Sequence, residues 1–356
     1  MPDARPADGM AARNLFPSKI AIPAPMAQGR RNLSKRSQDW RWSSPDSVRR
    51  SRRAPDAASN RLYALRRKSA PYVFLAPYVL VAGCFFLYPL INAAILTFYQ
   101  TNGPKSRLFV GLSNFIFVLG DPELYTALKN TTIYAIFSIF LQLPLSLGLA
   151  LLLNAREDRL KGFFRLVIFS PHLVGPVFVG VLFGVLFTPH YGLFNQTLQA
   201  LAGWGLDQRW LEQPELIMPA LIVTSLWMYV GFNMIYFLAA LQNVDPNLVE
   251  AARIDGANAF QVFWNVTIPA IKPVAAFVVI MSTIGSFQLF ELPYTLLKGT
   301  YGPKNAGLTM VGYLYKNAFE SGDLGTGAAI GWLLAFIIFL ISLAQIRVSG
   351  ALRKEA

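Results

Sequence analysis

Residues 244–260 read VDPNLVEAARIDGANAF, and they carry the capping signals of two short helices. Asp245 is a good N-cap, and Pro246 suits the first position of a helix. Gly256 can adopt the left-handed conformation that ends a helix, and Asn258 can cap the helix that follows. The stretch therefore predicts a short helix–turn–helix, although by spacing alone an ordinary surface hairpin fits it equally well.

This stretch lies between two long runs that contain no charged residue. Six such runs occur in a chain that is 54% hydrophobic and 14% charged, whereas soluble domains contain roughly 25% charged residues. About 20 apolar residues in a helix cross a bilayer core about 30 Å thick. The pattern predicts an all-α integral membrane protein, because buried helices of a soluble protein would not explain six runs of this length. The predicted spans are about 73–98, 131–153, 165–188, 217–241, 273–292 and 325–346.

The first 68 residues are basic and have the composition of a disordered tail. Sixteen of the 32 Lys and Arg precede Pro71, against five acidic residues. Positive charge beside a membrane span holds that end of the chain in the cytoplasm and attracts anionic lipid. We favour this role over nucleic-acid binding. Both termini and the loop 242–272 are then expected in the cytoplasm, and residues 69–356 form the membrane domain.

Glu250-Ala251-Ala252, followed by Gly256 and by Ile268-Pro269, resembles the "EAA" loop of binding-protein-dependent ABC transporter permeases. In that family the loop docks into a groove on a separate ATPase subunit and transmits its closure to the channel. The resemblance implies that ATP and Mg²⁺ are bound by the partner ATPase, and that this chain carries no cofactor. The coupling residues that it implies are Glu250, Ala251, Ala252, Asp255 and Gly256.

Three further segments resemble the same family: 109–115 (FVGLSNF), 191–195 (YGLFN) and 210–211. Segments 231–234, 238–242 and 282–288 resemble its carbohydrate branch, which includes maltose, lactose and glycerol-phosphate permeases. The resemblance implies the type I ABC importer permease fold with six transmembrane helices, in the inner membrane of a bacterium. It also implies three partners: a second homologous permease, an ABC ATPase dimer and an extracytoplasmic solute-binding protein. One departure is Tyr301, which stands where that branch usually has a Gly-Gly-Gly-Pro turn.

The fourth and fifth predicted spans carry the residue types that bind a sugar. Amides and carboxylates bind hydroxyl groups, and aromatic faces cover the C–H surface of the ring. The resemblance favours Gly231, Asn233, Phe287 and Gln288, and Glu291 adds a carboxylate near one end of the fifth span. Asn233 and Gln288 equally fit hydrogen bonds between helices, and Glu291 equally fits a carboxylate at the membrane interface.

The sequence also limits the other functions to be considered. It contains no G-x-x-x-x-G-K-[ST] phosphate loop, so ATP chemistry is expected on another chain. Cys84 is the single cysteine, and His172 and His190 have no ligand-type residue at metal spacing, so we expect no disulfide and no metal site. The first alternative is an ion-coupled secondary transporter, although the spans lack the charged residues that such proteins use. A membrane-embedded enzyme is the second alternative.

Overall fold

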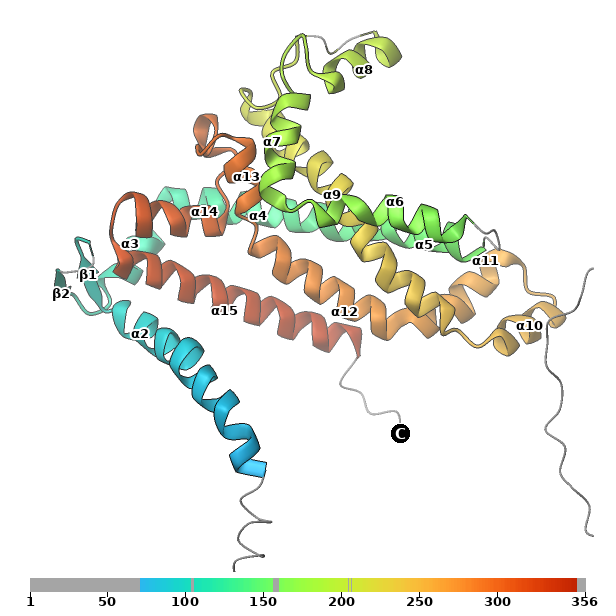
Figure 1. Cartoon of the computed structure of the whole chain (residues 1–356), viewed down its shortest axis with the longest axis horizontal. Coiled ribbons are helices and arrows are strands. Elements are labelled where there is room, and N and C mark those ends of the chain that lie inside the picture. Colours follow the sequence, from blue (N-terminus) through green and yellow to red (C-terminus); the bar gives the residue numbers. More distant parts are fainter. Residues whose placement is uncertain (1–70, 104–105, 156–159, 204, 206, 351–356) are drawn as a thin grey trace, which may run out of the picture. The chain divides into compact units, whose positions relative to one another are not determined.

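The computed structural model describes residues 71–103, 106–155, 160–203, 205 and 207–350. The predicted tail 1–68 lies outside them. Contacts divide the chain into Met1–Phe74 and Leu75–Ala356, and the packing below is that of the second unit. Its strands and helices, labelled in Figure 1, are β1 Tyr99–Thr101, β2 Arg107–Phe109, α2 Tyr88–Leu96, α3 Ser113–Gly120, α4 Pro122–Phe137, α5 Leu143–Ala155, α6 Lys161–Leu173, α7 Pro176–Leu186, α8 Leu193–Ala202, α9 Pro214–Gln242, α10 Pro246–Ile254, α11 Ala259–Val262, α12 Ile268–Phe287, α13 Glu291–Leu296, α14 Met310–Tyr315 and α15 Leu324–Ser349.

Within the described residues, five helices are long and apolar enough to cross a membrane. Four π-helical turns and one 3-10 turn join or extend the helices: Gly83–Leu87, Ser138–Gln142, Phe263–Thr267, Lys316–Glu320 and Pro303–Asn305. The five long apolar helices are Pro71–Leu96, Pro122–Ala155, Pro214–Gln242, Ala259–Phe287 and Leu324–Ser349. They confirm a membrane helix at five of the six predicted places, although the ends of the helices are shifted.

The predicted third span is broken in two. α6 and α7 meet at a bend of 94°, so the continuous helix expected over 165–188 is wrong. Gly175 takes a left-handed φ of 83°, and Pro176 begins α7. Proline has no N–H to donate to the preceding turn and disfavours the helical conformation of the residue before it. The two halves count as one span only if the bent pair crosses the membrane together.

The predicted fifth span is displaced toward its N-terminal side. α11, a π-helical turn and α12 form one helix, Ala259–Phe287, which ends five residues before the predicted boundary at 292. Pro269 sits at the start of α12 and Pro273 lies inside it, and neither proline interrupts the helix. Membrane helices tolerate proline where neighbouring structure satisfies the freed backbone groups.

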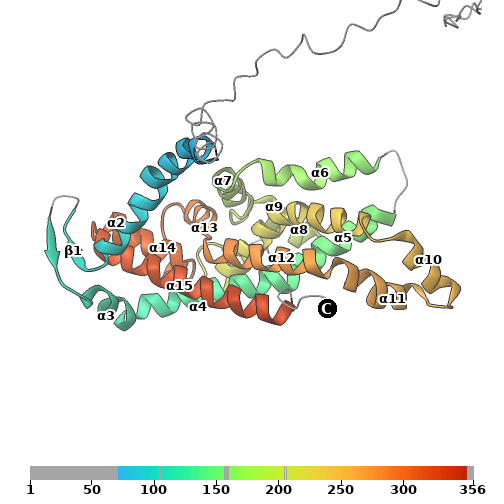
Figure 2. The same cartoon turned by 90° about the horizontal axis from the view of Figure 1, so that it is seen from below.

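α9 is the most buried of these helices, and α5, α6, α7 and α12 all pack against it. α15 lies along α12 and α14 (Figure 1). α10 and α11 lie beyond the same end of α12, as Figure 2 also shows. The core is therefore built around α9 and α12, and many of the apolar side chains on α2, α6 and α7 remain exposed, as they do on helices that face lipid or another subunit.

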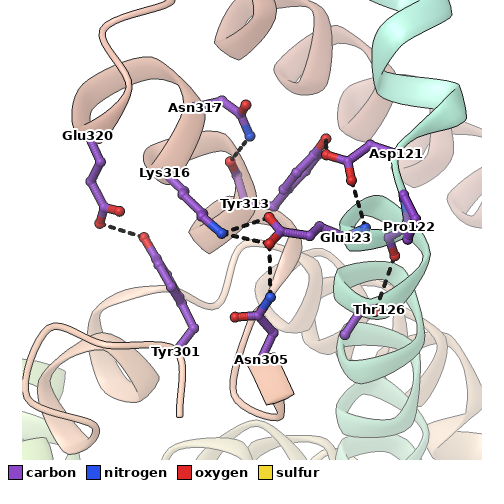
Figure 3. A network of polar contacts seen from close by, with 10 residues as sticks. All are labelled: Asp121, Pro122, Glu123, Thr126, Tyr301, Asn305, Tyr313, Lys316, Asn317 and Glu320. Atoms are coloured by element: carbon purple, nitrogen blue, oxygen red, sulfur yellow. Dashed lines mark hydrogen bonds and ion pairs between the residues drawn. The ribbon is translucent and has the colours of Figure 1, made fainter. Parts of the chain in front are cut away.

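Between α12 and α15 the chain forms a linking segment (residues 288–323) that polar side chains hold against α4 (Figure 3). Lys316 Nζ lies 2.7 and 2.8 Å from the two carboxylate oxygens of Glu123, and Asn305 Nδ2 donates to the same carboxylate at 3.0 Å. The Tyr313 hydroxyl donates to Asp121 at 2.6 Å. Burial and this hydrogen bond raise the pKa of Tyr313 above its usual value, so the phenol stays a neutral donor.

Tyr301, the departure from the expected glycine-rich turn, also belongs to this network. Its hydroxyl donates to Glu320 at 2.7 Å, and the Lys316 ammonium lies 5.9 Å from the centre of its ring. The bulkier side chain is therefore accommodated by a hydrogen bond within the linking segment (Figure 3).

The half-buried pair between Glu123 and Lys316 should stabilise the fold measurably. Their side chains are 33% and 31% exposed, so we expect Glu123→Gln or Lys316→Met to lower the free energy of unfolding by about 1–2 kcal/mol. A double-mutant cycle, measured by thermal unfolding of the purified protein, should give a clear coupling energy.

The pair Arg209–Glu212 is the matched control, since its nitrogen–oxygen distance is 3.2 Å but both side chains are 61% exposed. Its coupling energy should lie near zero, within about 0–1 kcal/mol. Equal coupling energies for the two pairs would contradict the stabilising role of the Glu123 network.

Candidate functional site

A cavity of about 180 Å³, here called the central cavity, lies between α4, α9 and α12. The π-helical turn Ser138–Gln142, between α4 and α5, contributes to its wall. Its lining residues are Tyr134, Ser138, Gln142, Tyr229, Phe232, Asn233, Tyr236, Phe277, Val278, Met281, Ser282, Gly285, Ser286 and Leu289.

Three polar side chains in this wall are buried but unpaired. Ser138, Gln142 and Asn233 are 7%, 4% and 6% exposed, and within the described chain their side chains make no hydrogen bond. Their polar atoms face the open space of the cavity, because the fully enclosed side-chain atoms without a partner belong, among the described residues, to Arg165, His172, Ser342 and Gln345. Polar groups inside a protein are nearly always hydrogen-bonded to protein or to water. Their free donors and acceptors therefore suit a polar ligand or bound water.

Aromatic rings form another part of the wall. Phe232 and Tyr236 meet edge to face with ring centres 5.2 Å apart, and Tyr236 lies 5.9 Å from Phe277. His172, in the last turn of α6 before the 94° bend, stacks on Phe232 at 4.2 Å. The broken span therefore contacts the cavity wall through this ring pair.

Of the five predicted pathway residues, the structure brings only Asn233 to the central cavity. Phe287 is buried in a separate core cluster with residues of α4, α14 and α15. Gln288 is an exposed residue that caps the end of α12, and Glu291 is exposed at the first position of α13. Gly231 lies where α6 and α9 pack together, as described below. For the four residues other than Asn233, a role in the sugar pathway stays a prediction, and the geometry of the central cavity does not favour it.

Sequence reasoning missed Ser138 and Gln142. Their signal is a pair of polar residues four positions apart within the second charge-free run. Residues at this spacing share a helix face.

The loop that was predicted to form a helix–turn–helix does so. Asp245 caps α10 by accepting from the Asn247 N–H at 2.9 Å, and Gly256 has a φ of 86°. Asn258 and Gln261 exchange two hydrogen bonds, of 2.8 and 2.9 Å, at the start of α11. The predicted caps and the predicted turn are confirmed.

The residues predicted to couple the permease to an ATPase lie together on and just after α10. Glu250, Ala251, Asp255 and Gly256 are exposed, and Ala252 is half-buried. α10 packs against α11 and the π-helical turn Phe263–Thr267, which continues into α12. A force on α10 can therefore reach the helix that lines the central cavity.

Among the residues that the structure describes, no three His, Cys, Asp or Glu side chains gather as a metal site would require.

The sequence model of the binding-protein-dependent transport system inner membrane component matches residues 68–354. The chain belongs to this family. It is therefore a permease subunit of an ABC importer of the inner membrane, which is a transport protein and not an enzyme. The family assignment sets aside the ion-coupled transporter and the membrane-embedded enzyme.

Individual relatives match most of the chain. The arabinooligosaccharides transport system permease protein AraP of Bacillus subtilis is 38% identical over 289 residues, which are 81% of this chain and 91% of that protein. The lactose transport system permease protein LacF of Rhizobium radiobacter is 34% identical, over 77% of this chain and 92% of that protein.

A solved structure shares the fold of the permease. A bacterial ABC transporter involved in the import of the acidic polysaccharide alginate matches with a TM-score of 0.71, at 24% identity, over 83% of this chain and 100% of the matched chain. This agreement confirms the type I fold that the sequence resemblance implied.

Gly231 is a packing residue in the permease. A Cβ at this position would overlap the carbonyl oxygen of Ile168 on α6 and come within 3.0 Å of the Phe169 Cα. Both contacts are with backbone atoms, which cannot move aside as a flexible side chain can. Glycine therefore allows the close approach of α6 and α9, as small residues do in membrane helix pairs.

We expect Gly231→Ala to destabilise the permease by about 1–3 kcal/mol, because overpacking forces the two helices apart. Thermal unfolding in detergent, together with the yield of monodisperse protein, measures this effect. Gly148→Ala in α5 is the control, since its added Cβ meets no atom within 4 Å. The control should be neutral or stabilising by up to about 1 kcal/mol. Equal unfolding temperatures for both variants would show that the close packing of α6 against α9 does not require glycine at position 231.

Proposed function

We propose that this permease carries a carbohydrate across the inner membrane through the central cavity. The observation that supports this most directly is the set of buried, unpaired polar side chains Ser138, Gln142 and Asn233. Sugar hydroxyl groups both donate and accept hydrogen bonds, so they can satisfy amides and hydroxyls together. The aromatic rings of Phe232, Tyr236 and Phe277 offer apolar faces to the C–H surface of a sugar ring.

The relatives support the same substrate class, since AraP and LacF are named for arabinooligosaccharides and lactose. We infer a saccharide for this permease as well, delivered by the solute-binding protein on which the family depends. We further infer that a second permease subunit completes the channel.

Asn233 should contact the transported sugar. Replacing Asn233 by Ala removes one or two hydrogen bonds, which corresponds to a roughly 2–10-fold increase in the KM for uptake. Uptake of labelled arabinooligosaccharide and lactose by cells that express the complete importer measures the change.

Gln288→Ala tests the alternative that the sequence favoured. Because Gln288 caps α12 outside the cavity lining, we expect its KM to stay within about twofold of the original protein. A larger effect of Gln288→Ala than of Asn233→Ala would move the pathway away from the central cavity.

Transport requires energy, and we propose that a separate ATPase dimer, which binds ATP and Mg²⁺, supplies it through α10. The exposed Glu250 carboxylate can pair with a charged or hydrogen-bonding group of the ATPase. The small side chains of Ala251 and Ala252 allow the partner surface to approach closely beside it. α10 packs against the helix that continues into α12, so movement of the ATPase would reach the cavity. This proposal places α10 and both chain termini in the cytoplasm.

The coupling role makes a strong prediction for two variants. Glu250→Lys should repel the partner contact, and Gly256→Val should distort the turn after α10, because a left-handed φ costs a residue with a Cβ roughly 1–2 kcal/mol. We expect both to abolish uptake and to return ATP hydrolysis, stimulated by sugar-loaded binding protein, to its basal rate.

Gly203→Val is the matched control for backbone strain. Gly203 has a φ of 70° at the end of α8, and like Gly256 it has no atom within 4 Å of an added Cβ. It should leave stimulated ATP hydrolysis nearly unchanged. Normal stimulation and uptake in both α10 variants, with the complex intact on co-purification, would overturn the coupling assignment.

A further inference from the structure

We propose that the central cavity selects neutral saccharides and rejects anionic ones such as uronates and sugar phosphates. The inference rests on the proposed function and names the substrate class more closely. The similar proteins do not decide the question, because lactose is neutral whereas alginate is an acidic polysaccharide.

The described residues that line the central cavity include no acidic and no basic side chain. An anion that leaves water for a site of low dielectric constant needs a cation or several converging donors to replace its hydration. The described wall supplies no cation, so a carboxylate or phosphate would have only neutral amide and hydroxyl donors to replace its hydration, and we expect it to lose more on entry than a neutral hydroxyl group.

The unpaired groups in the cavity wall can act both as hydrogen-bond donors and as acceptors. The side chains of Gln142 and Asn233 each present a carbonyl acceptor as well as an amide donor, and Ser138 presents a hydroxyl that can do either. A neutral sugar hydroxyl can serve all of these groups. A carboxylate or phosphate oxygen can only accept, so it could use the amide N–H and serine hydroxyl donors but could not supply a proton to the two amide carbonyl oxygens, which a neutral hydroxyl group at the same place can do.

The test measures binding to the permease itself. The complete complex of permease, partner permease and ATPase is placed in lipid nanodiscs without binding protein, so that the selectivity of the binding protein does not enter. The probes are β-1,4-galactobiose and galactotriose, which are neutral, and digalacturonate and trigalacturonate, which have the same number of rings and carry carboxylates. We expect the neutral probes to bind at least about tenfold more tightly at equal ionic strength.

Two variants ask whether the cavity wall sets this preference. Asn233→Lys and Gln142→Lys each add a cation to the cavity wall, from different elements. Either variant should lower the ratio of the Kd values of the anionic and neutral probes by about tenfold. Gln199→Lys adds the same charge at an exposed position on α8 and should leave the preference unchanged. Two positions are used because a lysine at one of them could prevent assembly, which co-purification of the complex reports.

Each outcome has a defined meaning. Equal or tighter binding of the galacturonates, or a preference that neither cavity lysine alters in an assembled complex, overturns the neutral-saccharide inference. Absence of binding by every probe, while the complete importer still takes up a saccharide, overturns it too, because selection then occurs outside the cavity. Failure of the complete importer to take up any saccharide, neutral or anionic, instead overturns the proposed function.

Discussion

A peptide group that is buried away from water must find its hydrogen-bond partner inside the protein, and this condition acts on every non-helical part of a membrane permease. Helices satisfy it internally, but turns and helix ends do not. Buried asparagines meet the requirement in three places, since one amide supplies two donors and an acceptor. Asn114 donates to the carbonyls of Thr97 and Tyr99, Asn130 to those of Asn305 and Leu308, and Asn195 to that of Gln208 while accepting from Trp210.

The same condition determines where α12 ends. Thr309 donates its hydroxyl to the carbonyl of Leu289 at 2.7 Å, just after the last residue of the helix. The chain can leave the helical path here without exposing an unpaired carbonyl. As a result Leu289 becomes part of the cavity wall, and α13 turns to pack against α7. The linking segment thus helps to shape the cavity although it contributes few of its lining residues.

The features that could be predicted from the sequence are those that a few neighbouring residues determine. Charge-free runs revealed the membrane helices, and Asp245, Gly256 and Asn258 predicted the caps of the loop helices because capping depends on a few neighbouring residues. Gly175-Pro176 was a local signal for the break in the third span that a search for apolar runs passes over. By contrast, the end of α12 depends on Thr309, twenty residues later, and no local pattern reports such a contact.

The cavity residues were the hardest to predict, for a geometric reason. A sugar-binding residue type in a span can be recognised from sequence, but the side of the helix that faces the cavity depends on the packing of three helices. Asn233 lines the cavity, whereas Gly231, two positions earlier on α9, faces α6. Two positions along an α-helix turn the side chain by about 200°. Residue type alone therefore could not separate a binding residue from a packing residue.

Two of the π-helical turns lie at the two features on which the proposed function rests, the loop helices and the central cavity. Phe263–Thr267 joins the loop helices to α12, and Ser138–Gln142 carries two of the unpaired polar groups. A π-helical turn holds one extra residue in a helix, and such turns are frequent at functional sites. In this permease the turns keep the helices continuous, so movement can pass along them, while Ser138 and Gln142 both face the cavity. In the proposed function, the transmission of movement and the binding of substrate therefore both involve π-helical turns.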